Sequence, residues 1–260
     1  METNKKNVIV IMNFTHVYEQ ENFLKNINYQ LVDCTDLNGT DCYCDLESQQ
    51  QLKKRIAPFP IEGIHFIDSG NYHYMTKLWT DRIHEPFSLI VFDHHPDMKP
   101  TLFDELLSCG CWVKEMLENN LFLRKVVIIG ASESLTAKIS SNYNGRLKFY
   151  GEKKLSQEEG WKEFSKGYLT EPVYLSIDKD VLDTTTAVTN WDQGSLTLSE
   201  LRDLLYIIFR KERIIGVDIC GECPDSLSIF NEQDIAKVNS KTNRELLSIF
   251  LAERYKQATE

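Results

Sequence analysis

Nearly continuous apolar runs, separated by amphipathic stretches, constrain the fold of this chain more than any other feature. The runs are rich in Val and Ile and have the length of strands that are buried on both faces. They occupy residues 8–14, 63–68, 87–93, 125–131, 147–151, 173–178 and 214–220. Helical patterns follow them at residues 47–56, 102–117, 156–166, 199–210 and 243–255. This alternation predicts an α/β fold whose parallel sheet is covered by helices on both faces.

Two capping signals support the predicted helices. Thr197 is followed by Glu200, and Thr242 by Glu245, with the spacing of capping boxes, so we expect helices to start at these points. No internal repeat, low-complexity segment or Pro/Gly-rich linker divides the chain. We therefore expect residues 1–260 to form a single domain.

Composition argues against several classes of partner. The formal net charge is −10 and no basic cluster is present, which argues against a nucleic-acid partner. No stretch approaches the ~18 apolar residues that span a bilayer, and the polar start of the chain does not resemble a signal peptide, so we expect no membrane partner. Seven cysteines without secretory features predict reduced thiols in the cytoplasm.

Polar side chains of the metal-ligand type stand where three apolar runs stop. They are His73, Asp93, His95, Asp97, Asp178 and Asp180. In open parallel sheets the functional crevice lies beyond the carboxyl ends of the strands. On an extended segment alternate side chains share a face, so each Asp-x-(His/Asp) repeat is expected to point one way.

Four carboxylates and two imidazoles that converge need compensating positive charge. One divalent cation would rarely require four carboxylates, whereas two would leave the set near neutral. Mixed oxygen and imidazole ligation suits Mn²⁺ better than a thiolate zinc site. Two cations roughly 3.5–4 Å apart can bridge and activate a water molecule. Taken alone, each Asp could be a helix cap, and His94, on the opposite face, is expected to be structural.

The same motifs resemble those of the ureohydrolase family, which includes arginase, agmatinase and formimidoylglutamase. Asp93-His94-His95-Pro96-Asp97 is similar to the family's Asp-Ala-His-x-Asp motif, and Ser176-Ile177-Asp178-Lys179-Asp180 begins a match to Ser-Ile-Asp-x-Asp-x-Leu-Asp. Gly70-Asn71-Tyr72-His73 resembles Gly-Gly-Asp-His, and Gly194-Ser195-Leu196-Thr197 resembles Gly-Gly-Leu-Thr. Order and spacing agree over roughly residues 60–220.

The resemblance implies a three-layer α/β/α sandwich with a mainly parallel sheet of about eight strands. It implies two Mn²⁺ ions, one held by His73, Asp93, Asp97 and Asp178, the other by Asp93, His95, Asp178 and Asp180. The family reaction is hydrolysis of a C–N bond in a guanidino or other linear amidine compound by metal-activated hydroxide. The resemblance also implies a small-molecule substrate; relatives often form homo-oligomers, either trimers or hexamers, but the sequence does not fix the oligomeric state of this chain.

The chain departs from the family pattern around the substrate. Cys109 stands where the family commonly has a proton-shuttling His, and a thiol can transfer protons only if its pKa is tuned. Gly221 aligns with a Glu that grips the guanidinium, and Glu222 follows one place later. Cys109, Glu222 and Asp97 are the candidate catalytic residues. Lys99 stands where arginases help to hold the amino-acid end of the substrate, and this cation favours an acidic substrate over arginine.

Three further features leave alternatives open. Trp191 could form a wall beside the metals or pack on the sheet edge, and Glu133 could contact substrate or sit in a first helical turn. Both are candidate substrate-binding residues beside Lys99. Cys220 and Cys223 form a CxxC, which could bind zinc, but a lone CxxC is a weak signal and we favour a buried inert thiol for Cys220.

We therefore expect a metallohydrolase of the ureohydrolase family that acts on a linear amidine other than arginine. Two alternatives remain. One is a catalytically silent protein of the same fold that binds a metal or ligand, motivated by the replaced His and Glu. The other is an amidohydrolase or deacetylase that uses the same metal site.

Overall fold

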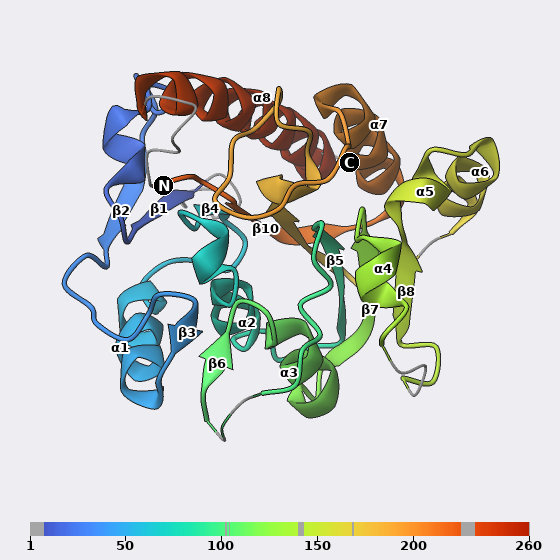
Figure 1. Ribbon diagram of the computed structural model, residues 1–260, viewed down its shortest axis with the longest axis horizontal. Helices are drawn as coiled ribbons and strands as arrows, with labels where there is room; N and C mark the ends of the chain where they lie inside the picture. Colours follow the sequence, from blue (N-terminus) through green and yellow to red (C-terminus); the bar gives the residue numbers. More distant parts are fainter. Residues whose placement is uncertain are drawn as a thin grey trace.

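The protein is built around a sheet of eight parallel strands, in the order β2-β1-β4-β10-β9-β5-β7-β8 (Figure 1). The computed structural model describes residues 8–101, 103, 105–139, 143–167, 169–224 and 232–259, with side chains as far as residue 253. The strands are β1 (Ile9–Asn13), β2 (Gln30–Asp33), β4 (Ile64–Phe66), β5 (Phe87–Phe92), β7 (Leu123–Ile129), β8 (Leu147–Tyr150), β9 (Val173–Asp178) and β10 (Ile214–Cys220). The predicted parallel sheet is therefore confirmed.

Helices cover both faces of this sheet, as predicted. In Figure 1, α7 and α8 lie along the upper face, and α1, α2 and α3 lie along the lower one. The α-helices are α1 (Leu46–Ile56), α2 (Met75–Thr80), α3 (Trp112–Asn119), α4 (Glu133–Thr136), α5 (Glu152–Leu155), α6 (Glu158–Lys166), α7 (Leu198–Lys211) and α8 (Glu232–Thr259). The 3₁₀ turns are η2 (Val17–Gln20), η3 (Gly70–Tyr72) and η4 (Lys179–Val181).

Two apolar cores form because alternate residues of each strand point to opposite faces. Ile9 and Ile11 of β1 join the core beneath α7 and α8, whereas Val10 and Met12 join the core beneath α1, α2 and α3. The strands are therefore buried on both sides, which explains why they read as unbroken apolar runs.

The helix predicted over residues 102–117 is wrong in its first half. α3 begins only at Trp112, and Leu107–Ser108 forms a short strand, β6, that pairs antiparallel with β3 (Tyr43–Cys44). Glu105 has a φ of 68°, in the left-handed region that a right-handed helix excludes. Leu107 thus reaches the core from a strand pair and not from a helical stripe, while residues 102 and 104 lie outside the described residues.

Of the two capping boxes, one is confirmed and one is wrong. Thr197 accepts a hydrogen bond from the backbone N–H of Glu200, and the Glu200 carboxylate accepts one from the backbone of Thr197, at the start of α7. Thr242 lies inside the continuous helix α8, and its hydroxyl donates to the Thr186 carbonyl. The Thr-x-x-Glu spacing therefore marks a helix start at Thr197, whereas at Thr242 the threonine makes a tertiary contact within a helix.

Among the described residues, no helix combines the length and the apolar character that crossing a membrane would require.

The Thr197 cap gives a test of the fold. Thr197→Ala removes the oxygen that satisfies the Glu200 N–H, and we expect the free energy of unfolding to fall by ~1 kcal/mol. Ser199→Ala, an exposed site in the same first turn, should change it by less than ~0.5 kcal/mol. Urea denaturation followed by circular dichroism measures both, and equal losses would contradict a specific capping role.

Candidate metal centre

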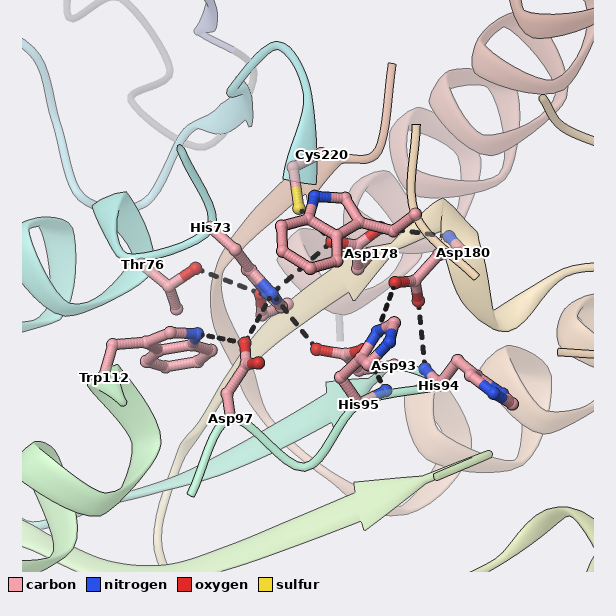
Figure 2. A network of polar contacts seen from close by, with 12 residues as sticks. His73, Thr76, Asp93, His94, His95, Asp97, Trp112, Asp178, Asp180 and Cys220 are labelled. Atoms are coloured by element: carbon pink, nitrogen blue, oxygen red, sulfur yellow. Dashed lines mark hydrogen bonds and ion pairs between the residues drawn. The ribbon is translucent and has the colours of Figure 1, made fainter. Parts of the chain in front are cut away.

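The six candidate ligands come from the carboxyl ends of neighbouring strands in the middle of the sheet. Strands β4, β10, β9 and β5 are consecutive in the sheet order. Phe66 pairs with Ile219, Cys220 with Asp178, and Ile177 with Phe92, so the segments that follow these residues emerge side by side. The predicted clustering at strand ends is therefore what the sheet produces (Figure 2).

Turns, and not extended backbone, aim these side chains. Asp97 has a φ of 50°, and the Asp93 carboxylate accepts a hydrogen bond of 2.6 Å from the His95 backbone N–H. Asp178 caps the 3₁₀ turn η4 by accepting from the Asp180 N–H at 3.0 Å. The predicted period-two alternation is thus wrong in its mechanism, because the carboxylates themselves fold the chain back.

His73 stands at the centre of the first group of ligand atoms. Its Nδ1 lies 3.2 Å from Asp93 Oδ2, 3.1 Å from Asp97 Oδ2 and 3.6 Å from Asp178 Oδ2. The ring and all three carboxylates are buried. Four donor atoms from three strand ends therefore surround one point.

His95 organises the second group, which shares Asp93 with the first. His95 Nδ1 lies 2.7 Å from Asp180 Oδ2 and 3.7 Å from Asp93 Oδ1. One oxygen of Asp93 thus faces each histidine. Asp178 joins the His73 side, whereas its other oxygen is engaged by the Asp180 backbone. The geometry accommodates two adjacent cations, with Asp93 between them.

Electrostatics within the cluster show how strongly it needs positive charge. Burial and then the neighbouring carboxylates of Asp180 and Asp93 raise the pKa of Asp178 to about 7. Burial and then Asp93 raise the pKa of Asp180 to about 6. Burial lowers the pKa of His95, but its bonds to Asp180 and Asp93 outweigh this and raise it to about 11. Without a cation, protons must therefore supply the compensating charge.

A buried hydrogen-bond chain holds the ring of His73 from behind. Ser176 Oγ donates to Asp218 Oδ1 at 2.6 Å and lies 2.9 Å from His73 Nε2. Because the single hydroxyl proton of Ser176 goes to Asp218, Ser176 accepts from Nε2–H and leaves the lone pair of Nδ1 toward the carboxylates. Thr76 Oγ1 adds a second donor to Asp218 at 3.2 Å. Such partners orient a metal-binding histidine.

The buried cluster also contains an orphaned atom that a cation would satisfy. His73 Nδ1 is buried and makes no hydrogen bond of acceptable geometry, although carboxylate oxygens surround it. Trp112 Nε1 donates to Asp97 Oδ2 at 2.6 Å and fixes the carboxylate that faces it. An imidazole nitrogen aimed into a ring of buried oxygens fits a divalent cation in place of a proton, so the residues present fit the metal pair that the resemblance implies.

A pocket of about 450 Å³ opens above the cluster. The six candidate ligands lie at its floor, and Met98, Pro100, Leu135 and Ile139 give it apolar walls. Cys109, Lys99 and Trp191, three of the candidate site residues, also line it. Trp191 is held in place by a 2.8 Å hydrogen bond from its indole N–H to Asn71 Oδ1.

Two other predicted site residues do not reach this pocket. Glu133 accepts a hydrogen bond from the Lys153 backbone and begins α4. Glu222 is fully buried, and Lys179 Nζ and Asn243 Nδ2 donate to its carboxylate. Gly221 stands beside the cluster instead, with a φ of 91° and the position of a Cβ only 2.5 Å from Asp178 Oδ1. A side chain at that position would collide with a candidate ligand.

Sequence reasoning also missed residues that the structure brings to the site. Lys138 and Cys42 line the pocket, and Cys220 lies beside His73 and Asp178. Asp218 could have been noticed, because a carboxylate inside an apolar run needs buried partners. Cys42 and Lys138 lie in loops, and the conformation of a loop cannot be predicted from the hydrophobic periodicity of the sequence.

Comparison with known proteins gives matches along most of the chain. A family model described as the arginase family matches residues 11–226. An uncharacterized protein of Thermotoga maritima is 34% identical over 232 residues, which cover 89% of this chain and 86% of that protein. N(1)-aminopropylagmatine ureohydrolase of Synechocystis is 23% identical over 193 residues, which cover 72% of this chain and 62% of that enzyme.

Solved structures share the fold at low sequence identity. A formiminoglutamase variant of Trypanosoma cruzi, solved with Mn²⁺, has a TM-score of 0.69 at 13% identity and covers 96% of this chain and 95% of that one. Agmatine ureohydrolase of Thermoplasma volcanium has a TM-score of 0.68 at 14% identity, covering 99% and 94%. These likenesses confirm the three-layer fold with its eight-stranded parallel sheet.

The cluster predicts which single changes remove metal. Asp93→Ala takes away the carboxylate that faces both histidines, and Asp178→Ala takes away another oxygen beside His73, so we expect loss of at least one bound cation per chain in each. Elemental analysis of protein dialysed after loading with Mn²⁺ measures this. Glu133→Ala, a strand-end carboxylate outside the pocket, should keep the full content. Full content in both aspartate variants would refute the assignment.

Proposed function

This chain belongs to the arginase family, and we propose that it hydrolyses a C–N bond of a guanidino or other linear amidine compound. One observation carries the proposal. Two histidines and four aspartates from neighbouring strand ends meet at the floor of a single pocket, in two groups that share Asp93. This is the arrangement that a two-cation hydrolase requires.

We propose that two divalent cations occupy the two groups. His73, Asp93, Asp97 and Asp178 would hold one, and Asp93, His95 and Asp180 the other, with Mn²⁺ the ion expected from the family. When bound, the pair would neutralise the carboxylates and lower the pKa of a water between them. Asp178 would serve as a second shared ligand if it rotates away from the Asp180 N–H. Trp112, through its bond to Asp97, and Ser176, through His73, position ligands and do not touch substrate.

Cys109 is the proposed proton donor for the leaving amine. It lines the pocket, and its backbone N–H donates to the Cys42 carbonyl at 2.9 Å, which fixes it at the pocket wall. The neighbouring Cys42 thiol and burial raise the pKa of Cys109 well above its usual range. The thiol therefore stays protonated at neutral pH, which excludes it as a base, and donation of its proton would require bound cations to bring its pKa down toward neutrality.

Two lysines point to a substrate with a negatively charged end. Lys99 and Lys138 line the pocket together, and neither forms an ion pair with any described residue. Among the described residues that line the pocket, the only carboxylates are the four candidate metal ligands. An anionic group on the substrate would therefore meet cations at the wall while its C–N bond lies over the floor. We propose a guanidino acid or formimino acid as the substrate class.

A second candidate function follows from Gly221. The family position that grips a guanidinium carries no side chain here, and Glu222 is turned away into its pair with Lys179. A neutral amide needs no such carboxylate. The alternative function is therefore hydrolysis of an amide, including deacetylation, by the same centre. A further alternative is a protein that binds metal but catalyses no reaction.

A substrate panel separates these functions. Protein loaded with Mn²⁺ is incubated with formimidoylglutamate, guanidinobutyrate, guanidinopropionate, arginine, agmatine and acetylated polyamines, and urea, ammonia, formamide and acetate are measured. We expect turnover of acidic amidines and little of agmatine, because the pocket wall is cationic. Acetate release alone would favour the amidohydrolase, and no product from any compound would sink the enzymatic proposal in this form.

The lysines have their own test. Lys99→Glu reverses the charge on the pocket wall, and we expect kcat/KM for acidic amidines relative to cationic ones to fall by ~10-fold or more, mainly through KM. Lys241→Glu, an exposed site on α8, makes the same charge change away from the pocket and should leave the ratio unaltered. An unchanged ratio in the Lys99 variant would remove Lys99 from substrate recognition.

A further inference from the structure

A buried thiol lies against the His73 side of the metal centre. Cys220 is the last residue of β10 and pairs with Asp178 in the sheet. Its Sγ is fully buried and lies 3.2 Å from Asp178 Oδ2, the same oxygen that is 3.6 Å from His73 Nδ1. Figure 2 shows the sulfur directed toward this carboxylate and the ring. His73, Asp178 and Cys220 therefore form a third compact group of donor atoms.

The spacing of these donors is that of ligands around one ion. Donors at roughly 2.0–2.3 Å from a cation lie about 3–4 Å from one another. Asp178 Oδ2 lies 3.2 Å from Cys220 Sγ and 3.6 Å from His73 Nδ1, and all three donor atoms lie within 4.8 Å of one another. His73 Nδ1, the orphaned buried atom, is aimed into the same space. The thiol thus lies beside the same group of buried donor atoms as His73 Nδ1.

The other member of the CxxC does not share this position. Cys223 is buried in a separate apolar cluster with Val188 and Ile235. A zinc centre built from Cys220 and Cys223 together is therefore not what the fold assembles. Cys220 belongs instead with the histidine and aspartates of the neighbouring strands.

We propose that Cys220 is a thiolate ligand of the cation held by His73, so that the two metal positions differ in preference. On binding, the thiol would lose its proton to solvent and its sulfur would form the metal bond, without any change of oxidation state. The His73 position would favour a thiophilic ion such as Zn²⁺ or Co²⁺. The position of His95, Asp93 and Asp180 offers only oxygen and nitrogen and would discriminate less against Mn²⁺. The inference rests on the proposed metal centre, but not on any substrate.

Cobalt provides a direct readout of the sulfur–metal bond. Wild-type protein loaded with Co²⁺ should show a near-ultraviolet sulfur-to-cobalt charge-transfer band together with the visible bands of the ion. Cys220→Ser should lose the charge-transfer band and keep the visible ones, because oxygen and nitrogen ligands remain. Cys223→Ala, which removes a buried thiol three residues away, should keep both. Cobalt content is measured by elemental analysis in every sample.

The outcomes separate this inference from the proposed function. Bound cobalt without a charge-transfer band in the wild type, or a band that persists in Cys220→Ser, would overturn the thiolate ligand and leave the metal centre standing. Failure of the wild type to bind cobalt or Mn²⁺ would overturn both. Only a cobalt-loaded protein whose band depends on Cys220 supports the inference.

A competition experiment tests the difference between the two positions. Apoprotein is dialysed against metal buffers in which the excess of free Mn²⁺ over free Zn²⁺ is raised stepwise, and both ions are measured per chain. Because nitrogen and oxygen sites also bind Zn²⁺ more tightly than Mn²⁺, we expect Mn²⁺ to displace Zn²⁺ from one position first, and the excess that displaces the second Zn²⁺ to be ~10-fold or more smaller in Cys220→Ser. Cys220→Asp, which places a charged oxygen ligand there, should lower that excess as well. Equal selectivity in the wild type and Cys220→Ser would contradict the inference.

Discussion

Mutual repulsion among four buried carboxylates is the constraint on which the rest of this structure depends. Asp93, Asp97, Asp178 and Asp180 are all nearly inaccessible to solvent and stand within a few ångströms of two imidazoles. Such a cluster is costly unless positive charge joins it, because the low-dielectric interior strengthens repulsion as much as attraction. The sheet supplies the rigid frame that keeps the carboxylates together, and the turns after each strand use the same carboxylates as backbone acceptors. The same carboxylates therefore stabilise the turns at the strand ends and create the negative charge that a cation would neutralise.

A second buried charge cluster lies behind the first and keeps it in place. Lys179, between Asp178 and Asp180, points to the opposite side and is fully buried against Glu222 and Asn243. Asn243 of α8 also donates to Glu21, whose pKa is raised well above its usual range by burial and then by Glu222. This network ties the ends of β9 and β10 to α8. The 3₁₀ turn η4 thus leaves Asp178 and Asp180 at the pocket and Lys179 against the helix layer.

Residue patterns predicted the layers and the six candidate ligands, because both depend on features that repeat along the chain. Apolar runs marked the strands, and the residues directly after them necessarily gather at one edge of a parallel sheet. The failures have other physical causes. Residues 102–111 looked helical, yet pairing of Leu107–Ser108 with Tyr43–Cys44 overrides local preference. Glu222 looked available one place after Gly221, but a positive φ at the glycine turns it behind the strand. Cys220 is buried, as predicted, but no local signal reports that the neighbouring strand places Asp178 beside it.

Gly221 limits which side chains can stand beside the candidate metal centre. Its left-handed backbone disfavours any side chain, and a Cβ there would come within 2.5 Å of Asp178 Oδ1 and 2.6 Å of the Lys179 backbone nitrogen. A glutamate introduced at this position would displace Asp178 unless the ends of β9 and β10 moved apart first. Any carboxylate that binds a cationic part of a ligand above this cluster would therefore have to come from another segment of the chain.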